Sequence, residues 1–186
     1  MRLFFSIPLS SKIHQCIENI MPTIKKSFPD GNWVKSVNRH VTLLFLGDLE
    51  KSEMESLCSF TQDLLPHYKP LQIDFTHLDA FPHRFKVNTL YYAVKPQPVL
   101  EKLGQELRNL SLKYGVQDQQ RFTPHITLAR FRPAIILPKQ HSWASFSMNE
   151  SQLFDRFELA LSILKPTGPI YQSVATFTFP KEEQHG

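Results

Sequence analysis

Cysteine, glycine and long hydrophobic runs are scarce in this sequence, and each shortage excludes a class of protein. The 186 residues include two cysteines, Cys16 and Cys58, which excludes a disulfide framework or a thiolate zinc site and favours a reducing, cytoplasmic compartment. The 6 glycines exclude collagen-like and low-complexity chains. No apolar run approaches the roughly 20 residues that span a bilayer. The short apolar start, interrupted by Pro8, predicts a first strand instead of a signal peptide, and no membrane association is expected.

The chain also has only a small excess of positive over negative charge. The chain carries 21 Lys and Arg against 17 Asp and Glu, a formal net charge of +4. This surplus is too small for a protein that coats duplex DNA, which needs a dense basic patch. It suits a small phosphate-bearing ligand or a nucleic-acid end. The alternative is that the surplus serves solubility, and charge alone favours this second interpretation.

Aromatic residues are abundant, which excludes a disordered chain. There are 15 Phe, and aromatics make up 12% of the residues; a chain of this length folds as one domain. Ser10 and Ser11 offer an N-cap to a predicted helix that places Ile13, Ile17, Ile20 and Ile24 on one buried face. Hydrophobic periodicity and turn residues also predict helices at 51–65 and 98–113, and strands at 2–9, 40–46, 71–78, 89–94, 122–131, 152–164 and 170–179. Residues 80–88 are expected to form a loop and 133–143 an exposed connection. The elements lack a strict βαβ rhythm, so the predicted fold class is α+β with a mainly antiparallel sheet.

One local pattern occurs twice in the chain. Residues 40–43 read His-Val-Thr-Leu and residues 125–128 read His-Ile-Thr-Leu, each inside a run with β propensity. From the composition of the chain, the chance expectation for H-x-T-L is about 0.05 occurrences. The copies are separated by about half the chain, and each follows a strand and a helix, as in a duplicated half.

Strand geometry gives this spacing a physical meaning. Side chains alternate across a strand, so His40 and Thr42 share one face, as do His125 and Thr127. The aliphatic residues between them pack behind. Two copies related by a pseudo-twofold axis would therefore direct two His-Thr pairs into one cleft.

Two histidines and two hydroxyls suit phosphoryl transfer without a metal or another cofactor. In-line displacement at phosphorus needs a base for the nucleophile and an acid for the departing oxygen, and histidine serves either role near neutral pH. Threonine hydroxyls can donate to the non-bridging oxygens. A single His-x-Thr is more often a structural feature, but two matched copies favour a catalytic site. A zinc site is disfavoured because H-E-x-x-H and suitably spaced partners are missing, and a serine hydrolase because G-x-S-x-G is missing.

At these motifs the sequence resembles the two-histidine phosphoesterase superfamily and, within it, the LigT-type RNA 2′,3′-cyclic phosphodiesterases, formerly called 2′-5′ RNA ligases. The resemblance covers most of the chain and is carried by RLFFSIPL, WVKSVNRHVTLLFLG and FTPHITLAR. It implies one 2H phosphoesterase domain over residues 1–186, made of two intertwined lobes. It also implies a bilobal α+β fold with a pseudo-twofold arrangement of two mainly antiparallel sheets, flanking helices and a central groove.

The resemblance further implies hydrolysis of an RNA 2′,3′-cyclic phosphate to a 2′-phosphomonoester, without a metal. Carried over by motif, His40 is the general acid and His125 the base, although these two roles could be exchanged. Thr42 and Thr127 would hold the phosphate oxygens. The expected partners are RNA ends or small cyclic nucleotides, with the protein acting as a monomer.

Arg130 completes the second motif and could supply charge to the phosphate. Strict alternation, however, places it on the face opposite His125, so it reaches the ligand only if the strand bends or ends first. A surface or lobe–lobe salt bridge is the equal alternative. Trp33, Phe122 and Tyr92 are candidates to stack a base, with a core role favoured for each. The remaining histidines show no repeated context and are interpreted as incidental: His14, His67, His77, His83, His141 and His185.

Two other functions stay open. One is a non-catalytic module that binds RNA ends, against which the two intact histidines argue. The other keeps the chemistry but acts on 2′-5′-linked oligonucleotides or ligates RNA, because the motifs address the phosphate and not the base.

Overall fold

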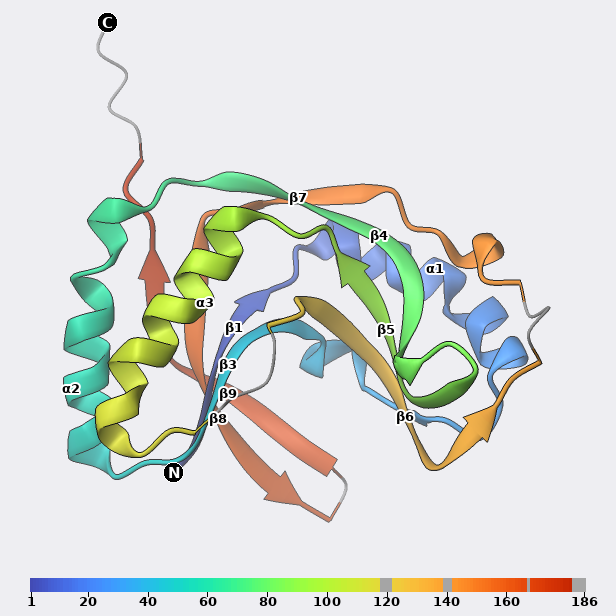
Figure 1. Cartoon of the computed structure of the whole chain (residues 1–186), viewed down its shortest axis with the longest axis horizontal. Coiled ribbons are helices and arrows are strands. Elements are labelled where there is room, and N and C mark those ends of the chain that lie inside the picture. The colour runs from blue at the N-terminus through green and yellow to red at the C-terminus, as the bar shows by residue number, and fades with distance from the viewer. Residues whose placement is uncertain (118–121, 139–141, 167, 182–186) are drawn as a thin grey trace, which may run out of the picture.

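The structure of the protein is a computed structural model that describes residues 1–117, 122–138, 142–166 and 168–181 (Figure 1). Its strands are β1 (Arg2–Pro8), β2 (Asn32–Trp33), β3 (His40–Asp48), β4 (Leu71–His83), β5 (Lys86–Val94), β6 (His125–Ile136), β7 (Glu150–Phe154), β8 (Arg156–Lys165) and β9 (Gly168–Thr178). Its helices are α1 (Ser11–Ser27), α2 (Lys51–Gln62) and α3 (Pro98–Ser111), with short 3₁₀ turns η1 (Ser36–Asn38), η2 (Leu65–His67), η3 (Leu112–Tyr114) and η4 (Ala144–Phe146). The predicted α+β class is confirmed.

The strands are connected in one curled sheet. Their order is β7-β4-β5-β6-β3-β1-β8-β9, β2 pairs with β6, and the pairings between described strands are antiparallel. At the centre, β3 and β6 pair only where Val41 lies opposite Ile126. The two predicted sheets are thus two parts of one sheet joined along a short seam.

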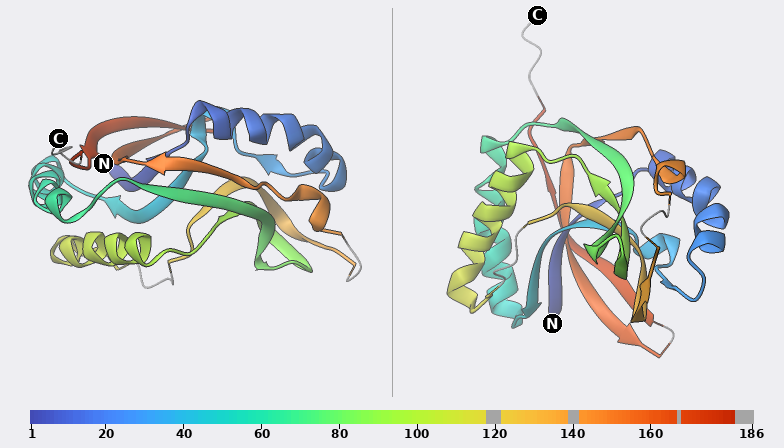
Figure 2. Two further views of the ribbon diagram at one scale, coloured as in Figure 1. Left: turned by 90° about the horizontal axis from the view of Figure 1, so that it is seen from above. Right: turned by 45° about the vertical axis from the view of Figure 1, so that its right-hand side comes forward.

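A strand–helix–strand unit occurs on each side of this seam. One unit contains β1, α1 and β3, with β2 and η1 between the helix and its second strand, and the other contains β5, α3 and β6, with η3 in between. In each unit the two strands are antiparallel neighbours, and the second begins at the histidine of the motif. Helices α2 and α3 lie side by side at one end of the molecule and α1 lies at the other (Figures 1 and 2). The division of the domain into two lobes stays a prediction.

The helices form where the sequence caps and patterns them. The Ser10 hydroxyl accepts a hydrogen bond from the Ile13 amide, which satisfies a free donor at the start of α1. Ile13, Ile17 and Ile24 are fully buried on one face. Gly115 ends η3, directly after α3, in a left-handed conformation with φ 76°. Within the part of the chain that the structure describes, no helix is long and apolar enough to cross a membrane.

Phenylalanines fill much of the core, which accounts for their abundance. Phe5, Phe28, Phe75, Phe154 and Phe157 are each less than 2% exposed. Burying a ring of this size contributes about 1.5–3 kcal/mol by area alone, so the sheet and the helices are held together mainly by aromatic and aliphatic packing.

Three sequence-based element predictions are wrong in part. Residues 80–88 are mostly strand, because β4 and β5 extend into a hairpin that turns between His83 and Lys86. The first residues of 133–143 belong to β6. The single strand predicted at 152–164 is two strands, β7 and β8, separated at Asp155. In the first case β4 and β5 pair with each other across a short turn, and in the other two pairing with a strand distant in sequence decided the outcome. Local propensity does not encode such pairing.

Candidate active site

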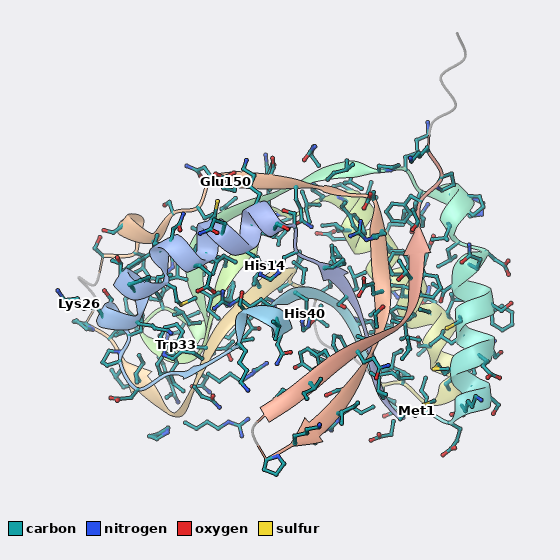
Figure 3. The ribbon with its side chains drawn as sticks, turned by 180° about the vertical axis from the view of Figure 1, so that it is seen from behind. Met1, His14, Lys26, Trp33, His40 and Glu150 are labelled. Carbon is teal, nitrogen blue, oxygen red and sulfur yellow. The ribbon has the colours of Figure 1, made fainter. Side chains whose placement is uncertain are left out.

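A cavity of about 260 Å³ lies over the seam between β3 and β6. His40 and Thr42 from β3, and His125 and Thr127 from β6, line its floor. Figure 3 shows His40 beside the β8–β9 hairpin, which supplies Tyr171 to the wall. The structure therefore brings both predicted His-Thr pairs into one cavity.

The alternation expected for a strand explains this placement. The four side chains are each half-buried, whereas Val41 and Ile126 behind them are fully buried. Since these two aliphatic residues face each other across the seam, the motifs approach one another through their apolar side. The polar side opens into the cavity.

Arg130 also lines the cavity, for a reason that strict alternation misses. One step along β5, from Leu90 to Tyr91, corresponds to two steps along β6, from Ala129 to Thr127. This is a β-bulge, and it shifts the alternation of side chains on β6 by one residue between Thr127 and Ala129. Arg130 therefore faces the same way as His125. It donates to the Thr89 hydroxyl at 3.4 Å, and it forms no ion pair with a described residue.

The first motif contains an equivalent bulge. One step along β1, from Phe5 to Ser6, corresponds to two steps along β3, from Leu44 to Thr42. The residue that matches Arg130 is Phe45, which lines the same cavity with its ring largely exposed. The two halves thus share a backbone but place a cation on one side and an aromatic ring on the other.

Backbone carbonyls fix the orientation of both imidazole rings. Nδ1 of His40 lies 2.8 Å from the Asn38 carbonyl oxygen, and Nδ1 of His125 lies 2.6 Å from that of Thr123. A carbonyl oxygen only accepts, so each Nδ1 carries the hydrogen, and Nε2 of the neutral ring holds the lone pair. In His40 this Nε2 lies 3.0 Å from the Thr42 hydroxyl, which can donate to it. Both rings are therefore held with Nε2 directed away from the backbone carbonyl, and in His40 the Thr42 hydroxyl lies against that nitrogen.

Burial lowers the pKa of both histidines. It brings the pKa of His40 to about 4, opposed by the hydrogen bond to Asn38 and assisted by the charge of His125. The pKa of His125 is likewise lowered by burial, opposed by the hydrogen bond to Thr123 and assisted by the charge of Arg130. Each ring therefore disfavours a proton unless an anion is bound beside it.

Aromatic side chains pack around each imidazole, and the sequence analysis missed them. His40 contacts Phe4 and Tyr171, with ring centroids 4.9 and 5.3 Å apart. His125 contacts Phe81 and Tyr91 at 5.1 and 5.0 Å. These four residues come from β1, β9, β4 and β5, so only the pairing of distant strands brings them to the motifs.

Asn38 links His40 to the β8–β9 hairpin. Its carbonyl oxygen holds the imidazole, and its side-chain amide donates to the Pro169 carbonyl oxygen at 2.8 Å. Asn38 is buried, and Gly168, Pro169 and Tyr171 of the hairpin line the cavity. Its position two residues before the motif histidine is the only signal in the sequence that could have found it.

The three candidates for base stacking have different positions. Trp33 lines the cavity, and Asn32 and Trp33 pair with Arg130 and Ala129. Tyr92 is fully buried in the core. Phe122 packs against Gly104 on α3. Of the three, only Trp33 is in contact with the cavity.

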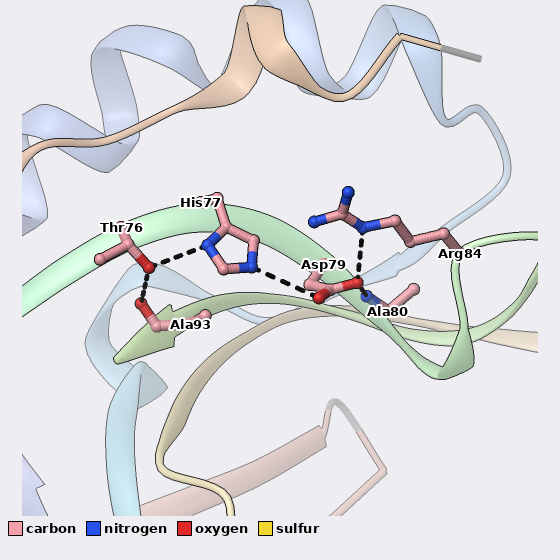
Figure 4. A network of polar contacts seen from close by, with 6 residues as sticks. All are labelled: Thr76, His77, Asp79, Ala80, Arg84 and Ala93. Carbon is pink, nitrogen blue, oxygen red and sulfur yellow. Dashed lines mark hydrogen bonds and ion pairs between the residues drawn. The ribbon is translucent and has the colours of Figure 1, made fainter. Parts of the chain in front are cut away.

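The other described histidines lie outside this cavity; His141 and His185 are not among the described residues. His77 takes part in a polar network on β4 (Figure 4), in which Nδ1 is 3.0 Å from the Thr76 hydroxyl and Nε2 is 3.4 Å from Asp79. Asp79 also accepts from Arg84 at 3.0 Å. The network supports the β4–β5 hairpin that carries Phe81 and Tyr91. Across the described ranges, no three His, Cys, Asp or Glu side chains are grouped closely enough to hold a metal ion.

Comparisons with known proteins agree with this architecture. The RNA 2′,3′-cyclic phosphodiesterase of Archaeoglobus fulgidus is 28% identical over 185 residues, covering 95% of this chain and 99% of the relative. The protein of the same name from Geobacillus stearothermophilus is 27% identical over 182 residues, and the alignment spans 94% of this chain but 56% of that relative.

Solved structures show the same fold at lower identity. TT0787 of Thermus thermophilus superposes with a TM-score of 0.82 at 22% identity, covering 98% of this chain and 100% of that one. LigT of E. coli complexed with 3′-AMP gives 0.77 at 24% identity, covering 97% and 98%. The model of the 2′-5′ RNA ligase superfamily matches residues 14–160. With most of the chain inside that match, the protein belongs to the 2′-5′ RNA ligase superfamily.

Proposed function

We propose that this protein is an RNA 2′,3′-cyclic phosphodiesterase, which hydrolyses the cyclic phosphate at an RNA 3′ end to a 2′-phosphomonoester. The observation that carries the proposal is the presence of two His-Thr pairs in one cavity, with both imidazoles oriented by carbonyls. The names of the relatives from Archaeoglobus and Geobacillus support the same substrate class.

In the proposed reaction, water attacks phosphorus and the bond from phosphorus to the 3′ oxygen breaks. His125 takes a proton from the water through Nε2, and protonated His40 gives one to the departing 3′ oxygen through Nε2. The hydrogen bonds at Nδ1 keep both rings aimed throughout. The net result is addition of one water: afterwards His125 releases its proton to solvent, and His40 takes one up from solvent.

Hydroxyl and guanidinium groups stabilise the charge on the phosphate in this proposal. Thr42 and Thr127 donate to the non-bridging oxygens, where negative charge is concentrated in the transition state. Arg130 supports the second pair, since it lies on the cavity wall without an acidic partner among the described residues. An anion held by these groups also raises the pKa of the nearby histidines and so favours the protonated acid.

The test is incubation with 2′,3′-cyclic AMP in EDTA, followed by chromatography against 2′-AMP and 3′-AMP. We expect EDTA-resistant hydrolysis and 2′-AMP as the product. A variant that lacks both motif histidines sets the background rate. Turnover equal to that background would instead favour a module that binds RNA ends, and 3′-AMP as the product would overturn the proposed direction of opening.

The depressed histidine pKa values predict the shape of the pH profile. The bell-shaped kcat/KM profile reports the free protein, in which one histidine must be protonated and the other neutral. Since burial lowers both pKa values, the maximum should lie on the acid side of about 6.5, the ordinary pKa of histidine. The kcat profile reports the complex, where the anionic phosphate favours the imidazolium, so its maximum should lie at higher pH. Coincident maxima above about pH 7 would contradict this expectation.

A further inference from the structure

A second cavity, of about 380 Å³, adjoins the first. The two cavities share Phe45, Pro169 and Tyr171 as a common wall. On its far side the second cavity is lined by Arg2 from β1 and by Ser162 and Leu164 from β8. It therefore extends the space over His40 along the part of the β8–β9 hairpin nearest its turn, toward the start of β1, where Met1 lies (Figure 3).

The walls of the second cavity combine apolar surface with one cation. Leu164 is 68% exposed and Phe45 is 58% exposed, so both present apolar surface to a ligand in the cavity. Arg2 forms no ion pair with a described residue. Asp48, its partner in the β1–β3 pairing, contacts the Met1 amine at 3.9 Å instead. An exposed ring, an exposed aliphatic chain and an uncompensated guanidinium together suit a base joined to a phosphate.

The covalent structure of an RNA end determines which part of the substrate can lie in the second cavity. In a terminal 2′,3′-cyclic phosphate both the 2′ and 3′ oxygens are bonded to phosphorus, so the strand leaves the last ribose only through its 5′ oxygen. With the cyclic phosphate at the histidines, the terminal nucleotide occupies the first cavity. The preceding nucleotide must then lie in a space that adjoins it, and the second cavity shares a wall with the first.

We propose that the second cavity binds the nucleotide that precedes the cyclic phosphate. Its base packs on Leu164 and the outer face of Phe45, and the phosphodiester that joins it to the last nucleotide lies against Arg2. This inference rests on the proposed function and assigns the nucleotide before the terminal one a binding site of its own.

The test compares kcat/KM for 2′,3′-cyclic AMP with that for the dinucleotide ApA ending in the same cyclic phosphate. One stacked base and one phosphate contact should favour the dinucleotide by about tenfold. Leu164→Asp places a negative charge in the cavity and should bring the ratio of the two substrates close to one. Arg2→Gln should lower the ratio and weaken its dependence on salt. Leu153→Asp is the matched control, because Leu153 is 52% exposed on the distant edge strand β7, and it should keep the wild-type ratio.

Binding of the reaction products provides a second measurement that needs no turnover. The affinities for adenosine 2′-phosphate and for ApA 2′-phosphate should differ by a similar factor in the wild type and by little in Leu164→Asp. Hydrolysis of the mononucleotide with equal kcat/KM and equal affinities for both lengths would overturn the inference but leave the proposed function intact. Absence of hydrolysis for both substrates would overturn the proposed function itself. A dimer in solution that Leu164→Asp dissociates, with no change in the ratio, would assign the cavity to contact between two copies and overturn the inference.

Discussion

His125→Ala should lower kcat for cyclic phosphate hydrolysis by about 10²–10⁴, and His40→Ala should do the same. Each change removes the group that moves a proton at one of the two oxygens, while the other half of the cavity keeps its shape. Nε2 of His125 is the atom lost in the first case; its ring is oriented by the 2.6 Å hydrogen bond at Nδ1. The measurement is steady-state turnover of 2′,3′-cyclic AMP in EDTA.

The double variant separates a joint role from two independent ones. If acid and base act in the same step, His40→Ala/His125→Ala should be little slower than either single variant, because effects within a catalytic unit are far from additive. His67→Ala is the control, since His67 is exposed in η2 and does not line the cavity. Retention of more than about a third of the wild-type rate in both single variants would refute the proposed roles.

Arg130→Ala should lower kcat/KM by about 10², the second largest effect we expect. A positive charge beside the phosphate stabilises the transition state in a cavity where water is partly excluded. Arg130→Lys should recover part of the loss, because it restores the charge but not the forked geometry of the guanidinium. The fall should be accompanied by a higher pKa of His125, since the charge of Arg130 lowers it in the wild type.

Arg132→Ala is the matched control for this prediction. Arg132 is exposed two residues further along the same strand and does not line the cavity, so its loss should change kcat/KM by less than about twofold. If Arg130→Ala and Arg132→Ala behaved alike, Arg130 would be a surface residue, as strict alternation along β6 suggested.

The His-Thr pairs were predictable from the sequence because their geometry is local. Residues at i and i+2 in a regular stretch of strand share a face, so His40 and Thr42 could be placed together before any tertiary structure was known. The direction of Arg130 was not predictable in this way. It depends on a bulge that forms only because β6 pairs with β5, and nothing in residues 125–130 alone specifies it.

The same physical limit explains the other differences. The alternation of apolar and polar residues that predicts β4 and β5 is lost near Pro82 and Arg84. The hairpin continues there because the backbone groups of each strand form hydrogen bonds with those of the other. The rings that pack on the imidazoles come from four strands. Helix α1, by contrast, was well predicted, since its cap at Ser10 and its isoleucine spacing are encoded within a few turns.

The matched bulges of β3 and β6 also give the cavity a polarity. If the two halves were chemically identical, as the predicted pseudo-twofold axis would make them, a phosphodiester could bind in either of two orientations, and in the proposed reaction each histidine would serve as acid in half of the encounters. The backbone alone does not distinguish these two orientations, because both halves contain the same bulge. The equivalence is broken at the first outward position after each bulge, where one half carries Phe45 and the other Arg130. If the proposed function holds, we expect a substitution at either position to change the orientation of the substrate as well as its affinity.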